Sequence, residues 1–354
     1  MLKKKINFIV YIFILSAFFI TFGCEKSDNN LVNNKLPQPG NNSEINQDDL
    51  FNIDGIIDPS NFGWPRTVET SDGIVTIDKK PERIHSLSLG HTEILLGIMD
   101  IKKILAGYNF FVDPSISNIS ELSYNLKEIG FDPEEVIGLN PDVVIASKYT
   151  DVDTIAILKD SKIPVIRAEL DNSAEGNIPN ILFMGYILGA EKEAAVLSEE
   201  IKSRLAIINN NKPENNSNRV LSITKWATIF AAGSESTEGG IIEQAGAINA
   251  AADSGIDGHK EVSIESIAEI NPDIILLPQP KESAEEFKKE LLSNPVLFEV
   301  PAIKEKKIFH VHPPYFTTLS HWNIRGIEEL SKLLYTEEFV SIKFEDFKNW
   351  SEIE

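Results

Sequence analysis

One phrase occurs twice in this chain of 354 residues. The first copy is DPEEVIGLNPDVVIA at 132–146, and the second is VSIESIAEINPDIILL at 262–277. In each copy a polar residue able to cap a helix precedes a short amphipathic stretch, and an Asn-Pro pair ends that stretch. The apolar run that follows is typical of a strand buried on both faces of a parallel sheet. The repeat therefore predicts two equivalent helix–strand units.

A glutamate stands at the same position in both units. Glu134 and Glu265 each lie seven residues before the proline of their copy, and each is expected in the first turn of its helix. A carboxylate at that position complements the helix dipole. This effect would explain one such residue, but it leaves open why both copies carry it.

Strands and helices alternate on both sides of a long helical segment. The expected strands include 83–89, 164–170, 219–230 and 307–313, and the expected helices include 92–99, 152–161 and 283–292. Such alternation predicts parallel sheets with right-handed crossovers. Between the two halves, 191–209 would form a helix about 28 Å long at about 1.5 Å per residue. We therefore expect an α/β fold of two similar parallel-sheet lobes, joined by a single long helix, with a ligand cleft between the lobes.

The N-terminal segment indicates export from the cytoplasm. Lysines precede an apolar run from Phe8 to Phe22, which is typical of a secretory signal. The run is somewhat short for a spanning helix, which needs about 20 residues, but an uncleaved membrane anchor stays the alternative. Cys24 is the only cysteine, so no intrachain disulfide can form. The stretch TFGC at 21–24 resembles a bacterial lipobox, whose cysteine is lipidated and becomes the first mature residue.

Composition then divides the rest of the chain. The segment after Cys24 is rich in Asn, Ser and Asp, which predicts a flexible tether. The net charge of −21 argues against nucleic acid as a partner. The expected boundaries are 1–23 for the signal, 24–63 for the lipidated cysteine and tether, 64–170 for the N-terminal lobe, 171–217 for the linking helices, 218–340 for the C-terminal lobe and 341–354 for a tail.

Taken in order, these features resemble the class III solute-binding proteins of ABC importers, which carry ferric siderophores, haem or cobalamin. The resemblance covers about 66–340 and rests on GIVTIDKKPERIHSLSLGHTEILLGI, LNPDVVIASK, AAGSESTEGGIIEQAGAIN and INPDIILLP. It implies an extracytoplasmic lipoprotein, anchored to the membrane by lipid on Cys24. Such a protein captures a chelate of iron or cobalt and delivers it to a permease whose ATPase is a separate chain.

The resemblance also offers a reason for the repeated glutamate. In this family one surface glutamate on each lobe docks on an arginine pocket of the two-fold symmetric permease, and Glu134 and Glu265 match these two positions. A symmetric partner requires equivalent charges on both lobes. We therefore favour docking over simple helix stabilisation for this pair.

A ligand is expected at the carboxyl ends of the strands, where open α/β sheets bind their ligands. Large planar ligands favour aromatic walls with a few polar anchors. The candidates are His91, Tyr108, Phe110, Lys148 and Tyr149 in the N-terminal lobe, and Trp226, His259, Gln279, Tyr315 and Phe316 in the C-terminal lobe. By similarity to cobalamin-binding members of the family, Tyr108, Lys148, His259 and Tyr315 lie at or near contact positions.

Two other functions stay open. A bare metal ion as cargo would need three or four converging histidines and carboxylates, whereas the six histidines are scattered along the chain. An α/β enzyme could also use an interlobe cleft, but the chain has no GxSxG, Walker or HExxH motif. The sequence thus predicts no catalytic residue, no resident cofactor and no metal site, and it leaves the identity of the chelate open.

Overall fold

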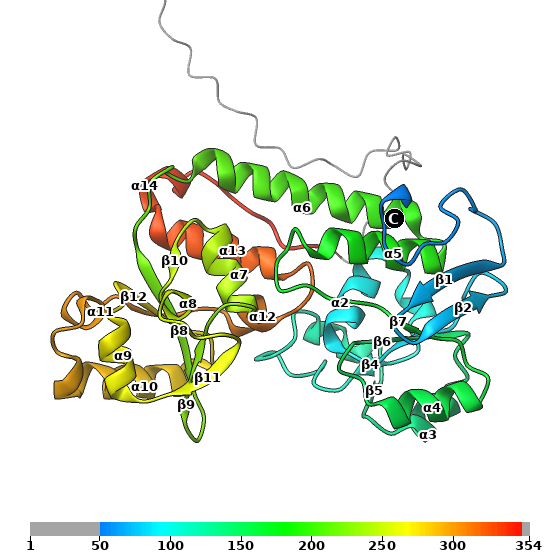
Figure 1. The fold of residues 1–354 in the computed structure, drawn as a ribbon, viewed down its shortest axis with the longest axis horizontal. Coiled ribbons are helices and arrows are strands. Elements are labelled where there is room, and N and C mark those ends of the chain that lie inside the picture. Colours follow the sequence, from blue (N-terminus) through cyan, green and yellow to red (C-terminus); the bar gives the residue numbers. More distant parts are fainter. Residues whose placement is uncertain (1–49, 349–354) are drawn as a thin grey trace, which may run out of the picture. The chain divides into compact units, whose positions relative to one another are not determined.

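The computed structural model describes residues 50–348, and these residues form an α/β fold (Figure 1). The expected signal peptide 1–23, the expected lipidation site Cys24 and the expected tether as far as residue 49 lie outside the described residues. The last six residues of the expected tail also lie outside them. Within 50–348, no helix has the length and apolar character needed to cross a membrane.

The N-terminal lobe contains a three-stranded parallel sheet in the order β3–β6–β7. These strands are β3 (Ile84–Ser86), β6 (Val143–Ala146) and β7 (Val165–Arg167), and every residue in them is buried. Burial on both faces explains why β6 is a continuous apolar run. The other elements of this lobe are α2 (Leu89–Ile98), η1 (Ile101–Lys103), β4 (Gly107–Tyr108), η2 (Ser120–Tyr124), β5 (Glu128–Ile129), α3 (Pro133–Gly138) and α4 (Val152–Asp160).

An antiparallel hairpin of β1 (Arg66–Thr70) and β2 (Gly73–Ile77) begins this lobe. The residues before it are packed: Leu50 is buried, Ile56 forms a bridge with Val68, and the Tyr186 hydroxyl donates to the Asp58 carbonyl at 2.9 Å. Residues 50–63, which we expected to belong to the tether, are therefore part of the globular fold. Leu50 is the buried apolar side chain of this segment, while Ile53 and Ile56 are partly buried against the core.

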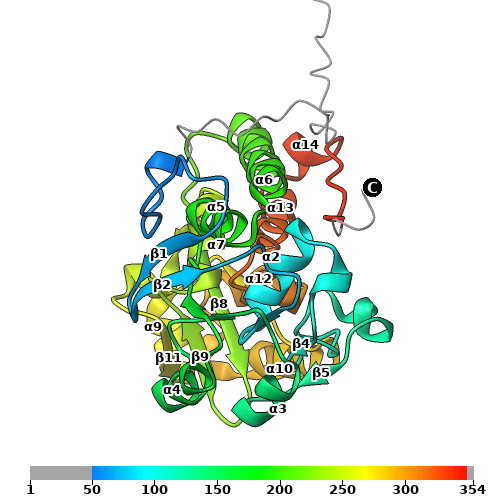
Figure 2. The same cartoon turned by 90° about the vertical axis from the view of Figure 1, so that its right-hand side faces the viewer.

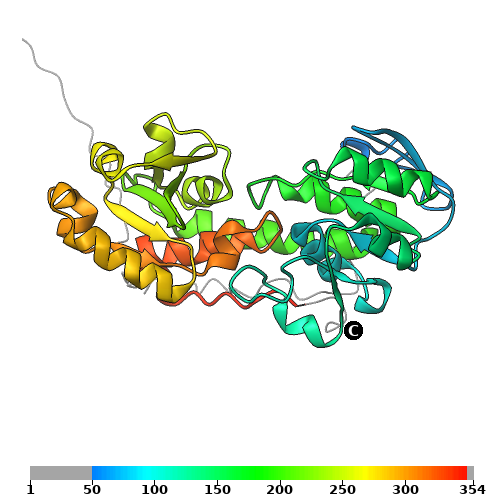
Figure 3. The same cartoon turned by 90° about the horizontal axis from the view of Figure 1, so that it is seen from below.

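The C-terminal lobe contains a six-stranded sheet in the order β11–β9–β8–β12–β13, with β10 beside β8. The pairs among β8, β10, β12 and β13 are parallel, whereas β9 is antiparallel to both β8 and β11. The strands are β8 (Arg219–Lys225), β9 (Ile229–Ala232), β10 (Ile248–Asn249), β11 (His259–Val262), β12 (Ile274–Leu277) and β13 (Ile308–His310). In Figure 3 each lobe carries its own sheet and its own helices.

The expectation of one strand at 219–230 was wrong. The chain turns after Lys225, where the Trp226 amide donates to the Thr228 carbonyl at 3.1 Å, and it returns as β9. The turn contains no Gly, Pro, Asn or Asp, which are the residues that usually mark turns in a sequence. The sheet of this lobe is therefore mixed rather than purely parallel.

Helices cover the C-terminal lobe. They are α7 (Thr237–Gln244), α8 (Ala250–Asp253), α9 (Ile264–Ile270), α10 (Lys281–Ser293), η3 (Pro295–Leu297), α11 (Pro301–Lys304), α12 (Pro313–Thr317), α13 (Asn323–Leu334) and α14 (Thr336–Phe339). The predicted helix at 283–292 is confirmed as α10.

The predicted linking helix is confirmed as α6 (Glu191–Asn211), which follows α5 (Asn177–Leu188). It packs against α5 and contacts both α2 of the N-terminal lobe and α13 of the C-terminal lobe (Figures 1 and 2). The fully buried Arg204 of α6 forms ion pairs with Glu200, at 2.7 Å, and with Glu328 of α13, at 2.8 Å. Because a buried cation without partners would be costly, these pairs fix how α6 lies on α13.

The described part of the expected tail is also packed. Ile342, Phe344 and Phe347 are buried, and the Glu345 carbonyl accepts a hydrogen bond from Arg204 Nη2 at 2.6 Å. The ring of Phe347 meets that of His321 edge-on, with centroids 4.7 Å apart. Residues 341–348 therefore belong to the folded part of the protein.

Candidate functional site

A pocket of about 230 Å³ lies between the two lobes. The N-terminal lobe supplies residues that follow β3 and β6, at the carboxyl ends of these parallel strands, as expected for an open α/β sheet. The C-terminal lobe supplies the last residue of α12 and the two residues after it. The lining residues are Ser88, Leu89, Gly90, Ile116, Ser147, Lys148, Tyr149, Leu170, Thr317, Thr318 and Leu319.

The pocket combines an apolar surface with hydroxyl groups and one cation. Among the residues that we predicted to bind a ligand, Lys148 and Tyr149 line it. Lys148 Nζ lies 5.3 Å from the centroid of the Tyr149 ring, and within residues 50–348 it has no carboxylate partner. Lys225 pairs with Glu290 and Arg325 with Glu328, so Lys148 is the cation that can offer its charge to a ligand here.

Arg167 holds the loop that carries Lys148 and Tyr149. This buried arginine ends β7, donates from Nε to Asp72 at 2.9 Å, and donates from Nη1 to the carbonyl oxygens of Ser147 and Thr150 at 2.6 and 3.2 Å. Arg167 was not among the residues that we predicted for the site. The sequence feature that could have indicated this role is an arginine at the end of a buried strand, because a buried charge requires partners.

Glu93 of α2 is a second residue at this site that we did not predict. It is buried and accepts hydrogen bonds from the amide and the side chain of Asn118, both at 3.0 Å, and from the hydroxyls of Thr318 and Ser320 in the other lobe. Burial raises the pKa of Glu93, while these donors oppose the rise. A glutamate followed by the apolar run ILLGI was the only sign of it in the sequence.

Four predicted ligand residues have accessible or half-buried side chains but do not line this pocket. Tyr108 packs edge-on against Phe131, with centroids 5.2 Å apart, and burial raises the pKa of Tyr108 to about 12. Phe110 is exposed and has a left-handed backbone, with φ of 68°. Trp226 is 69% exposed at the turn between β8 and β9. His259 is exposed on β11.

His259 forms a pair with Glu238, a buried residue in the first turn of α7. The two side chains approach to 3.0 Å between His259 Nε2 and Glu238 Oε2. The hydrogen bond with Glu238 raises the pKa of His259.

Three further predicted ligand residues are buried and do not line the pocket. Phe316 is fully buried in the core. Gln279 is also buried: its Oε1 accepts from the Lys225 amide at 2.9 Å, and its Nε2 donates to the Ser283 hydroxyl at 3.0 Å. His91 is buried in the first turn of α2, where its Nδ1 lies 2.7 Å from Ser88 Oγ. Burial lowers the pKa of His91 to about 4, so the ring is neutral. These three residues are therefore not part of the pocket lining.

Tyr315 is half-buried and serves the fold. Its hydroxyl donates to Asp346 at 3.2 Å, its ring stacks on Trp322 with centroids 6.3 Å apart, and the Arg325 guanidinium lies 5.5 Å from the ring centroid. These contacts tie α12 to α13 and to the C-terminal segment. Sequence order could not reveal them, because Asp346 lies in 341–354, which we expected to be a tail outside the lobes.

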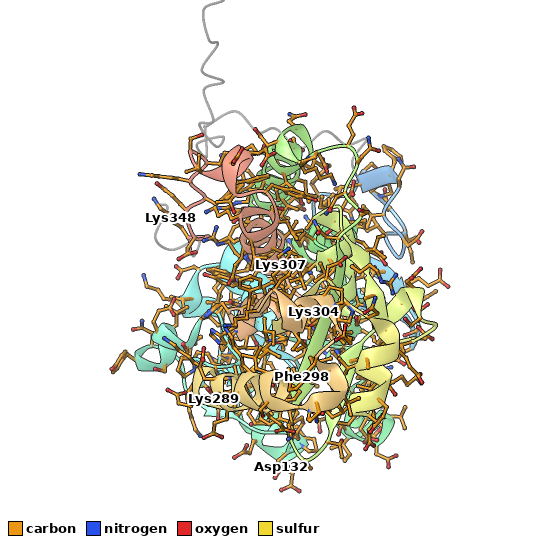
Figure 4. The ribbon with its side chains drawn as sticks, turned by 90° about the vertical axis from the view of Figure 1, so that its left-hand side faces the viewer. Asp132, Lys289, Phe298, Lys304, Lys307 and Lys348 are labelled. Atoms are coloured by element: carbon orange, nitrogen blue, oxygen red, sulfur yellow. The ribbon has the colours of Figure 1, made fainter. Side chains whose placement is uncertain are left out.

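The repeated glutamates occupy equivalent positions in the structure. Glu134 is the second residue of α3 and Glu265 the second residue of α9, and both side chains are exposed. Their helices begin at side-chain caps: Asp132 accepts from the Glu134 amide at 2.9 Å, and Ser263 from the Ser266 amide at 3.2 Å. Figure 4 shows Asp132 at the surface of the molecule. The Glu265 carboxylate accepts hydrogen bonds from the Glu265 backbone amide and from the Ser263 side chain, and these bonds lower the pKa of Glu265.

Both helices also end alike. Asn140 and Asn271, which precede the two prolines, have left-handed backbones with φ of 52° and 51°. Each helix is then followed by a fully buried parallel strand, β6 or β12.

Within residues 50–348 no group of three or more His, Cys, Asp or Glu side chains gathers in a way that could hold a metal ion.

Several proteins are similar in sequence to this chain. A lipoprotein of Bacillus subtilis strain 168, described as the uncharacterized ABC transporter substrate-binding lipoprotein YvrC, is 28% identical over 78% of this chain and 87% of its own length. A cobalamin-binding protein of Halobacterium salinarum is 26% identical over 59% of this chain and 57% of its own length. The molybdate-binding protein MolA of Haemophilus influenzae is 24% identical over 75% of this chain and 80% of its own length.

Solved structures and a family model agree with these relatives. A possible iron-binding periplasmic solute-binding protein from Staphylococcus epidermidis superimposes with a TM-score of 0.61, at 25% identity, over 73% of this chain and all of that one. The model of the family described as periplasmic binding protein matches residues 85–315, well over half of the chain. The chain therefore belongs to the periplasmic binding protein family, and it is an extracytoplasmic substrate-binding protein of an ABC transporter rather than an enzyme.

Proposed function

We propose that this protein is a lipid-anchored receptor that captures a chelate of iron or cobalt (a ferric siderophore, haem or cobalamin) and delivers it to its permease. The observation that carries the proposal is the interlobe pocket with Lys148 and the exposed ring of Tyr149 on its wall. The cobalamin-binding relative and the possible iron-binding structure support this class of cargo.

The size of the pocket determines how such a cargo would bind. About 230 Å³ is below the 300–1,000 Å³ typical of small-molecule sites, so a whole macrocycle does not fit inside it. We infer that the pocket receives an anionic arm of the chelate, which pairs with Lys148. The planar part of the cargo would then lie outside the pocket against Tyr149, and the exposed rings of Phe110 and Trp226 are further candidates for its walls.

A second cargo is favoured by the same pocket. A small tetrahedral oxyanion would fit within 230 Å³ and would find the hydroxyl of Ser147 in addition to Lys148. The other two hydroxyls of the lining are engaged, that of Thr317 with the Pro313 carbonyl at 3.0 Å and that of Ser88 with His91 Nδ1 at 2.7 Å. Hydroxyl and ammonium donors are suited to anions of this kind. The molybdate-binding relative supports this candidate.

Delivery to the permease is assigned to Glu134 and Glu265. Both are exposed at the same position of equivalent helices, one on each lobe. Because α6 packs against elements of both lobes, the two carboxylates would be held at a defined separation, as docking on a symmetric partner requires.

Binding measurements with purified full-length protein test the cargo. We would titrate haemin, cyanocobalamin, a ferric hydroxamate siderophore and molybdate, and repeat each titration with Lys148→Gln and with Lys148→Arg as the charge-preserving control. Saturable binding of one chelate, weakened in Lys148→Gln but not in Lys148→Arg, supports the leading proposal. Binding of molybdate alone supports the oxyanion, and binding of none of the four probes contradicts both.

Anchoring through Cys24 needs its own experiment. A lipidated cysteine after a cleaved signal holds a protein to the membrane with several acyl chains, whereas a single chain binds only marginally. Cys24→Ser should therefore move the protein to the soluble fraction or leave it uncleaved, as judged by fractionation and by the mass of the mature chain. A variant that is cleaved at the same place and stays in the membrane fraction would contradict this assignment.

A further inference from the structure

Glu93 connects the two lobes at the wall of the pocket. It lies on α2 of the N-terminal lobe, and its Oε2 accepts the Thr318 hydroxyl at 2.6 Å and also the Ser320 hydroxyl. Thr318 belongs to the C-terminal lobe and lines the pocket. Glu93 Oε1 accepts hydrogen bonds from the backbone amide and from the side-chain amide of Asn118. The same side-chain amide of Asn118 also donates to the Pro314 carbonyl at 3.0 Å. One buried carboxylate thus joins three segments.

The donors around Glu93 depend on it. Thr318 Oγ1 already accepts the Ser320 amide at 3.2 Å, and Ser320 Oγ accepts the Trp322 amide at 3.2 Å. The Ser320 hydroxyl directs its proton toward Glu93 Oε2. The Thr318 hydroxyl is close to two acceptors, Glu93 Oε2 at 2.6 Å and Ser320 Oγ at 3.0 Å, and the carboxylate is the nearer of the two. Both hydroxyls are buried, so water does not readily replace this acceptor.

We propose that Glu93 is a positioning residue that holds the wall Thr317–Leu319 against the N-terminal lobe, so that the pocket keeps its shape before any cargo arrives. A buried carboxyl group costs free energy unless its hydrogen bonds are satisfied, and a partly satisfied buried network is worse than an apolar contact. The network around Glu93 therefore favours the one placement of the wall that completes it. The inference relies on the proposed function only in treating the pocket as the cargo site.

Hydrogen exchange of the full-length protein without any ligand tests the proposal. In Glu93→Gln the side chain keeps its shape but Nε2 can no longer accept the two hydroxyl protons. We expect amide exchange to become about tenfold faster in 317–322, the factor for loss of about one buried hydrogen bond. Amides in β12 and in α10 should change less than twofold.

A matched control separates positioning from a general loss of stability. Tyr335→Phe removes a buried hydroxyl that donates to the Ala245 carbonyl at 2.9 Å, in a part of the C-terminal lobe that does not line the pocket. This variant should leave exchange in 317–322 unchanged. If Glu93→Gln accelerates exchange equally in all segments, or leaves 317–322 as in the wild type, the proposal is wrong.

Thr318→Val provides a second variant if Glu93→Gln fails to fold. The substitution keeps the shape of the side chain and removes one hydroxyl, while the bonds from Asn118 to Glu93 remain. Exchange should therefore rise in 318–322 but not at the Asn118 amide, and a rise at both would contradict the arrangement. Because no ligand is used, the outcome is independent of whether haemin, cyanocobalamin, a siderophore or molybdate binds.

Discussion

Asp142 and Asp273 attach the two copies of the repeated phrase to the neighbouring strand in the same way. Asp142 Oδ2 accepts the backbone amides of Glu82 and Arg83, at 3.0 and 3.1 Å, just before β3. Asp273 Oδ2 accepts the amide of Arg219, at 2.9 Å, at the start of β8. Each aspartate amide donates in return to the carbonyl of that arginine, at 2.7 and 2.8 Å.

The arginines complete this arrangement. The side chain of Arg83 donates to the Leu139 carbonyl at the end of α3, and that of Arg219 to the Ile270 carbonyl at the end of α9. The last carbonyls of a helix lack partners within the helix, so these bonds satisfy them. The Asn-Pro-Asp sequence is thus a structural joint, which leaves the glutamates at the other end of each helix available for another role.

Removing either aspartate should destabilise the protein. Asp142→Ala and Asp273→Ala each leave backbone amides without their acceptor, and we expect a loss of about 1–3 kcal/mol in the free energy of unfolding. Urea denaturation followed by circular dichroism measures this loss. Glu269→Ala, an exposed position on α9, is the control and should change little. If Asp142→Ala and Asp273→Ala have the same free energy of unfolding as Glu269→Ala, the joint contributes nothing to stability.

Glu134 and Glu265 should serve transport without affecting cargo binding. Glu134→Ala and Glu265→Ala should keep the wild-type denaturation midpoint and cargo affinity, yet lose most stimulation of the transporter ATPase in reconstituted vesicles. Loss of a paired interface charge weakens association, so replacement by Lys should be worse than Ala. Glu135→Ala, next to Glu134 on the same helix, serves as the control. Normal transport by the double variant would make the pair a helix-stabilising feature only.

Lys148 should contribute to affinity through charge. We expect Lys148→Gln to weaken binding of an anionic cargo about tenfold, as for loss of a charge-assisted hydrogen bond. The difference between variant and wild type should shrink as salt is added, because an exposed charge is screened. Isothermal titration at two ionic strengths measures both effects. An affinity that is the same for variant and wild type would place the anionic group elsewhere.

Trp226 and Tyr315 should respond differently to truncation. Trp226 is mostly exposed, so Trp226→Ala should leave stability unchanged and weaken cargo binding by about 1–3 kcal/mol. Tyr315 has partners in Asp346, Trp322 and Arg325, so Tyr315→Ala should lower the denaturation midpoint. Thermal denaturation and cargo titration of the two variants decide this. A fold that is insensitive to Tyr315→Ala would return that residue to the proposed site.

Buried histidines should make the protein sensitive to acid. Burial lowers the pKa of His85 and His91 to about 4 and that of His321 to about 3. The unfolded chain therefore binds more protons than the folded one between about pH 6.5 and 4, so the free energy of unfolding falls as the pH falls through this window. Glu93, whose pKa is raised by burial, acts in the opposite direction.

The contribution of one histidine can be isolated by substitution. His321→Phe removes a ring that packs against Trp322 and Phe347 and replaces it with one that does not titrate. The slope of unfolding free energy against pH between 6.5 and 4 should be smaller in this variant than in the wild type. Urea denaturation at several pH values measures it, and an unchanged slope would mean that His321 is protonated in the folded protein.

The sequence by itself determined the plan of this protein. The repeated Asn-Pro-Asp units, the apolar runs of β6 and β12 and the helical spacing of Leu197, Ile201 and Leu205 all arise from local periodicity. Periodicity reports which face of an element is buried, and it therefore predicted two α/β lobes and their linking helix.

Only the tertiary structure decided which side chains meet. The turn at Trp226 lacks the usual turn residues, and Phe316, Gln279 and His91 are buried by neighbours from other elements. Glu93 finds Thr318 and Ser320 far along the chain. The partner of a buried polar group is set by how distant segments pack, and this information is spread over the whole core rather than written in the residues beside that group.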